Sequence, residues 1–170
     1  MKFKRLLTLL LTISIICTSL CSCGVKEYVP CRQVLGALVD SEVGLPAGKI
    51  YDMRASGQDG EFLSDSLLCS LLGNGAMPAV RDSWIDGALF LSLGAHPCEF
   101  AVFLCDSRDA AQDTARLFCS RLDSVKTLKG DGKYASMLDS ARVCIIRNYV
   151  VLIISSDSDT ARSVARKIID

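Results

Sequence analysis

The sequence has no surplus of basic residues and almost no histidine. Its 170 residues include 19 Lys and Arg, 19 Asp and Glu, and one His. A protein that binds nucleic acid needs a surplus of cationic side chains to displace the counterions of the phosphates, so we expect no nucleic-acid partner. A single histidine also leaves little material for acid–base catalysis at neutral pH or for a metal site.

Several motifs that carry chemistry are absent as well. The chain has neither the Gly-x-Ser-x-Gly turn of α/β-hydrolases nor a phosphate-binding Gly-x-x-x-x-Gly-Lys loop. No Cys-x-x-Cys pair of the kind found in redox and zinc sites occurs. Asp157 and Asp159, which lie beside serines, are more simply the cap of a helix than a metal-binding loop. We therefore expect no cofactor and no metal, and we interpret the protein as a non-enzyme.

The N-terminal apolar run is too short to span a membrane. Lys2, Lys4 and Arg5 are followed by 15 mostly apolar residues at 6–20, whereas a membrane-spanning helix needs about 20. A basic head with a short apolar segment is typical of a secretory signal peptide, the alternative being an uncleaved anchor or a buried helix. Removal of residues 1–22 would leave a net charge of −3, so charge would not hold the mature chain at an anionic membrane.

The end of this segment resembles a bacterial lipobox. Residues 20–24 read Leu-Cys-Ser-Cys-Gly, so a leucine stands three positions before Cys23 and a small serine directly before it. The thiolate of Cys23 is the nucleophile that would take a diacylglyceryl group, and two acyl chains suffice for stable anchoring. Cys17 and Cys21 fit less well, because bulky residues precede them. We predict lipidation of Cys23 and a location on the extracytoplasmic face of the bacterial cell membrane.

Hydrophobic periodicity and turn residues predict an α+β fold. Two hairpins are expected, one from strands at 84–93 and 98–105 and one from strands at 143–146 and 149–154. Both strands of the second hairpin are apolar at every position, which predicts a central place in the sheet with both faces covered. Such hairpins favour a mainly antiparallel sheet with helices packed largely on one face. A short strand at 49–53 and helices at 61–72, from 106 or 107 to about 125, and from 156 or 157 onward complete the predicted order.

The length suits a single folded domain, and the hydrophobic content of 50% argues against disorder. We divide the chain into a lipoprotein signal peptide (1–22), a lipidated tether and lead-in segment (23–43), and a single α+β domain (44–170). Within the lead-in, residues 34–39 are apolar enough to pack as a short element.

Cysteine is the one enriched reactive residue type. Six of the nine cysteines follow Cys23, and an even number in an exported chain permits three disulfides. Most of the six sit beside helical apolar stripes or inside apolar strands, where a free cysteine behaves as a small hydrophobic side chain. Three interpretations of these six cysteines therefore stay open: free thiols in the core, structural disulfides, or a functional thiol. The six are Cys31, Cys69, Cys98, Cys105, Cys119 and Cys144.

His96 and Cys98 form a speculative thiol site. They are two positions apart, so on an extended segment their side chains would face the same side, and a histidine can activate a thiolate. A turn at His-Pro with an exposed imidazole ring is the simpler interpretation.

Several motifs in the second half of the chain carry a resemblance. They are residues 87–103, which include Pro-x-Glu-Phe-x-Val-Phe, the pair Arg-Leu at 121–122, Tyr134, and Asn-Tyr-Val-Val-Leu-Ile at 148–153. Together they resemble an uncharacterised family of lipoproteins, with one domain of unknown function, from Gram-positive and often anaerobic bacteria. The resemblance covers roughly residues 80–170. It implies an envelope location, a fold style and a habitat that favours free thiols, and it implies no activity.

Three hypotheses for function follow. The leading one is a non-catalytic, membrane-anchored lipoprotein that binds an envelope protein or a small ligand. The second is a thiol-dependent or redox protein that uses Cys98 with His96. The third is a structural lipoprotein without a soluble ligand.

Overall fold

The computed structural model describes four stretches of the chain, residues 28–56, 60–73, 77–130 and 132–170. These residues form one five-stranded antiparallel sheet with the strand order β1-β2-β3-β5-β4. The α+β class with a sheet built from hairpins is therefore confirmed. The strands are β1 (Gly48–Asp52), β2 (Trp84–Ser92), β3 (Glu99–Cys105), β4 (Arg142–Ile146) and β5 (Tyr149–Ile154).

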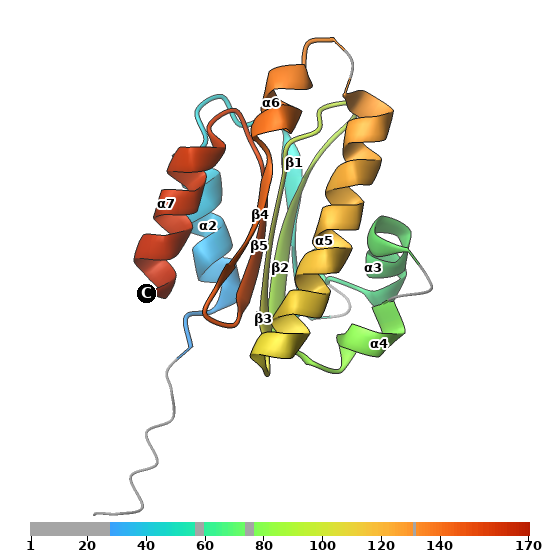
Figure 1. Ribbon diagram of the computed structural model, residues 1–170, viewed down its shortest axis with the longest axis vertical. Helices are drawn as coiled ribbons and strands as arrows, with labels where there is room; N and C mark the ends of the chain where they lie inside the picture. Colours follow the sequence, from blue (N-terminus) through green and yellow to red (C-terminus); the bar gives the residue numbers. More distant parts are fainter. Residues whose placement is uncertain (1–27, 57–59, 74–76, 131) are drawn as a thin grey trace, which may run out of the picture.

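Helices cover both faces of this sheet (Figure 1). Side chains from α3, α4, α5 and α6 join the core on one face, and side chains from α2 and α7 join the core on the other. The larger share of the helices lies on one face, as the sequence predicts, but the second face is closed as well. The helices are α2 (Cys31–Ser41), α3 (Asp65–Leu72), α4 (Met77–Arg81), α5 (Arg108–Lys129), α6 (Ala135–Ser140) and α7 (Ser158–Ile169).

The alternation of side chains along β3 builds both cores. All seven residues of β3 are buried, because Phe100 and Val102 face α2 and α7 while Ala101 and Phe103 face α5. On the α5 face the Phe103 and Phe118 rings pack edge to face at 5.3 Å between centroids, a geometry that aromatic pairs prefer. β3 and its neighbour β5 are thus the centre of the fold.

The second hairpin occupies a different place from the one expected. β5 is central and buried along its whole length, whereas β4 lies at the edge of the sheet. The expectation of a central β4 was wrong because its apolar residues are explained by the helices on each side. Val143 and Ile145 pack on the α5 face, and Cys144 and Ile146 pack on the α7 face. A strand that is apolar at every position is therefore covered on both faces of the sheet, but this pattern does not show whether it has a neighbouring strand on each side.

The boundary predicted at residue 44 falls too late in the chain. Helix α2 lies within the predicted lead-in segment, yet Cys31, Val34, Leu35 and Leu38 on its inner side are fully buried. These residues pack against the sheet in the same core as α7, so the packed domain includes α2. The predicted signal peptide (1–22) and Cys23 lie outside the described residues.

The helix caps follow the sequence signals closely. Ser107 caps α5 by accepting a hydrogen bond from the Ala110 N–H, and Asp157 caps α7 by accepting one from the Thr160 N–H. In the β4–β5 turn the residue in the left-handed region is Arg147, with φ 53°. An arginine in this region carries a small steric cost that glycine would not.

Candidate functional site

His96 and Cys98, the predicted thiol site, are joined by a hydrogen bond from the backbone of Cys98, and not by one from its thiol. The Cys98 N–H donates a hydrogen bond of 3.1 Å to Nδ1 of His96, so the ring nitrogen in question accepts from the backbone and not from the thiol. Burial, then the Lys133 and Lys129 cations, lower the pKa of His96 below its ordinary value. The ring packs edge-on against Tyr134, with 4.9 Å between centroids.

The Cys98 thiol belongs to the core on the α2 face. The residue is only 1% exposed and lies among the apolar side chains of that core. Burial, then the negative charges of Glu42 and Glu99, raise the pKa of Cys98 to about 12. A catalytic thiolate requires the opposite shift, so this geometry gives the thiol hypothesis no support.

Most other cysteines are also core residues. Cys31 and Cys105 are buried, and Cys144 is partly buried. Burial raises the pKa of each of these three thiols. Cys69 is half-buried on α3. Cys119 is the exception, because its free thiol is exposed on α5.

Glu99 and Arg121 form a buried ion pair near His96 that was not predicted from the sequence. Glu99 is 4% exposed, and its carboxylate faces Arg121 of α5, with Nη2 2.8 Å and Nε 3.2 Å from Oε2. The pair lines a hollow of about 230 Å³ together with His96 and Lys129. The signal available in the sequence was an acidic residue at the start of an otherwise apolar strand. The pair ties β3 to α5.

A second buried carboxylate, Asp86, holds α2 on the sheet. The N-terminus of α2 follows Pro30 and has no local side-chain cap. Asp86 Oδ2 instead accepts the Cys31 N–H at 2.8 Å, and its Oδ1 accepts the Gly87 N–H and pairs with Nε of Arg54 at 2.9 Å. The cap stands 55 residues away from the helix that it serves, so no local motif could reveal it.

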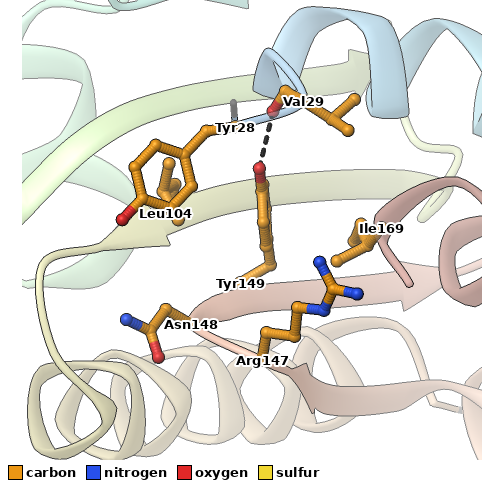
Figure 2. Close-up of a pocket in the computed structure, with 7 residues that line it drawn as sticks. All are labelled: Tyr28, Val29, Leu104, Arg147, Asn148, Tyr149 and Ile169. Atoms are coloured by element: carbon orange, nitrogen blue, oxygen red, sulfur yellow. Dashed lines mark hydrogen bonds between the residues drawn. The ribbon is translucent and has the colours of Figure 1, made fainter. Parts of the chain in front are cut away.

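A hollow lies where the chain enters α2 (Figure 2). Its volume is about 570 Å³, within the range of small-molecule sites. We call it the tether-side pocket, because Tyr28, the first described residue after the predicted tether segment, lines it. It is lined by Tyr28, Val29, Leu104, Arg147, Asn148, Tyr149 and Ile169.

The tether-side pocket is assembled from distant parts of the chain. Tyr149, the first residue of β5, donates a hydrogen bond of 2.8 Å from its hydroxyl to the Val29 carbonyl, which fixes the start of the described chain on the sheet (Figure 2). Burial is the first cause that raises the pKa of Tyr149 to about 12. This hydroxyl therefore stays protonated as a structural donor.

The pocket combines apolar walls with one guanidinium group and one amide. Figure 2 shows the Arg147 guanidinium directed toward Ile169 and the Tyr149 ring. Nη2 of Arg147 donates to the Asp170 carbonyl, and its Nε lies 3.7 Å from an Asp170 carboxylate oxygen. Tyr28 is 45% exposed at the rim. This lining suits an amphipathic ligand with a hydrogen-bond acceptor or an anionic group, and it contains no nucleophile paired with a base.

Among the residues that the structure describes, no group of three or more His, Cys, Asp or Glu side chains is placed to hold a metal ion. None of the helices in residues 28–56, 60–73, 77–130 and 132–170 is long and apolar enough to cross a membrane. No family model matches the chain, and no curated protein or solved structure matches it.

Proposed function

We propose that the protein is a membrane-anchored, extracytoplasmic lipoprotein whose domain binds a ligand without catalysis. Cys23 carries the diacylglyceryl anchor, the removed signal peptide comprises residues 1–22, and the tether-side pocket is the binding site. We also propose that the protein is a member of the uncharacterised lipoprotein family that its sequence resembles.

The position of the tether-side pocket carries this proposal. Tyr28 and Val29 line it, and only five peptide units separate Tyr28 from Cys23. An extended chain of five residues spans at most about 18 Å. A lipid on Cys23 would therefore hold the pocket close to the membrane surface, where a ligand with apolar and polar parts is abundant.

The chemistry of the described side chains supports binding over catalysis. The thiols of Cys31, Cys98, Cys105 and Cys144 have raised pKa values, and His96 accepts a backbone hydrogen bond. The pocket itself offers the guanidinium donors of Arg147 and apolar walls. Such groups position a ligand, and they do not activate water or attack a substrate.

The anchor is tested by the intact mass of the protein purified from the membranes of its host. We expect a chain that begins at Cys23 with a lipid-sized increment, and loss of that increment and of membrane fractionation in Cys23→Ser. Cys119→Ser, which removes an exposed thiol of the domain, is the matched control and keeps the lipid. A wild-type chain without a lipid would contradict the anchor.

The binding site is tested by the melting temperature of the full chain in the presence of octyl phosphate. A ligand that binds only the folded state raises the melting temperature with concentration. We expect a rise for the wild type and for Arg162→Gln, an exposed arginine of α7, and a much smaller rise for Arg147→Gln. Equal rises in all three proteins would remove the tether-side pocket as the binding site.

A further inference from the structure

We infer that the tether-side pocket receives the phosphate headgroup of a phospholipid in the membrane that holds the protein. The contact fixes the orientation of the domain, with the β4–β5 turn toward the lipid and the His96 loop away from it. The inference rests on the proposed anchor at Cys23 and goes beyond it, since an anchor alone leaves the domain free to rotate.

The geometry of the fold places the two loops at opposite ends. β2 and β3 pair in antiparallel register, with Asp86 opposite Leu104 and Leu91 opposite Glu99. Leu104 therefore marks the tether end of the sheet, and the loop that contains His96 marks the other end (Figure 1). Because the described chain begins at the tether end, an anchor on Cys23 brings that end within about 18 Å of the lipid.

The side chains at the tether end suit the interface of a bilayer. Tyrosine is favoured at the interface because its ring is apolar and its hydroxyl is polar, and Tyr28 is the half-exposed ring at the rim. Arginine binds phosphate oxygens through its fork of N–H groups. Asp170 contacts the Nε and Nη2 atoms of Arg147, so the Nη1 atom is left to bind a headgroup oxygen.

Because the tether keeps the pocket near the membrane, even a weak binding site for a lipid headgroup would be occupied. Asp170 offsets much of the Arg147 charge, so the pocket does not attract phosphate over a long range. A short flexible linker, however, keeps two joined sites at an effective concentration in the millimolar range. A headgroup contact with a dissociation constant of about 1 mM would thus be occupied in the anchored protein while being weak in solution.

The experiment measures the orientation of the lipidated full chain in vesicles. A fluorophore is attached at Asp106→Cys or at Ala95→Cys, each in the Cys119→Ser background. Asp106 is exposed at the tether end, next to Cys105, whose N–H bonds the Asn148 carbonyl. Ala95 is exposed in the loop at the opposite end. The vesicles contain phosphatidylglycerol and lipids that carry a quencher on the headgroup.

We expect quenching at position 106 to exceed quenching at position 95 several-fold. Arg147→Gln should bring the ratio toward one, Arg162→Gln should leave it unchanged, and vesicles of uncharged glycolipid without phosphate should lower it. Equal quenching at the two positions in a protein of confirmed lipid mass would overturn the inference and leave the anchor standing. A ratio that survives either Arg147→Gln or the loss of lipid phosphate would overturn it as well. Arg147→Lys, which keeps the charge, should retain part of the ratio and shows that loss in Arg147→Gln is not unfolding.

Discussion

The two ends of the β2–β3 hairpin each hold a buried carboxylate, and the two are partnered in different ways. Asp86, 1% exposed, receives two backbone N–H groups and Nε of an exposed arginine, Arg54. Glu99, 4% exposed, depends on the single guanidinium of Arg121, whose side chain is itself 20% exposed. The first carboxylate joins a helix end to the sheet, and the second joins a helix side to it.

This difference indicates which groups are left unpaired when each site is broken. Loss of Asp86 leaves backbone donors without an acceptor, and only a proline substitution removes such a donor. Loss of Glu99 leaves only Arg121, which can be replaced in turn. A carboxylate bound by backbone groups is therefore harder to compensate than one bound by a side chain.

The largest expected effect is that of Asp86→Ala. The substitution leaves the N-terminus of α2 uncapped, with the Cys31 N–H buried and unpaired, and we expect a loss of about 4 kcal/mol in the free energy of unfolding. Urea denaturation measures it. Asp106→Ala, an exposed aspartate at the same end, should change stability by less than about 0.5 kcal/mol. A loss below about 1 kcal/mol for Asp86→Ala would show that α2 does not depend on this cap.

The next effect is that of Arg121→Met, which leaves Glu99 buried without its cation. We expect a loss of about 3 kcal/mol, and the double variant Glu99→Leu/Arg121→Met should recover most of it, because an apolar pair can replace a buried ion pair at little cost. The double-mutant cycle by urea denaturation checks this. If the double variant were as unstable as the single one, the two carboxylates would not differ as described.

A smaller effect is expected for Arg54→Ala. The Arg54 side chain is 57% exposed, so solvent screens its pair with Asp86, and the backbone donors remain in place. We expect a loss of about 1 kcal/mol or less, which thermal unfolding measures. A loss equal to that of Asp86→Ala would mean that Asp86 acts mainly through its ion pair and not as the cap of α2.

The smallest expected effect on stability near neutral pH comes from Cys31 and Cys98, the thiols beside the two carboxylates. Burial raises the pKa of both Cys31 and Cys98, with Asp86 adding to the first shift and Glu99 contributing to the second. A folded-state pKa above the unfolded value of 9.0 gives stability that is complete below pH 9 and is lost as the pH rises toward about 12. Denaturation at pH 8, 9 and 10 should show a constant and then a falling stability. Native alkylation at pH 8 should label Cys119 and spare Cys31 and Cys98.

The strand order along the chain could be predicted because each hairpin is local. Residues 84–105 and 142–154 carry their own turns, and the Ser107 and Asp157 caps lie directly before their helices. The order of strands in the sheet could not be predicted in this way. The pairing of β3 with β5 joins residues that are far apart in the chain, and it moves β4 to the edge.

The candidate site was less predictable than the fold for the same reason. The sequence singles out His96 and Cys98 because they are close in the chain. In the structure His96 accepts a backbone hydrogen bond, and the Cys98 side chain is part of the core. The tether-side pocket joins Tyr28, Leu104 and Tyr149, three residues that no spacing rule connects. Asp86 and Glu99 each carry a local signal, an acidic residue in an apolar strand. The partners of the two carboxylates, in α2 and α5, could not be predicted from that signal.

The cap of α2 also sets an order of events when the chain is made. Residues 31–41 leave the ribosome first, but the carboxylate that completes their helix follows 55 residues later. At 5–20 residues per second this delay amounts to roughly 3 to 11 s, and β3, the other strand on which α2 packs, follows later still. For that time the apolar stripe of α2 has nothing to pack against, so a helix that ends as an outer layer of the domain is the segment a holding chaperone would cover until the sheet beneath it is made.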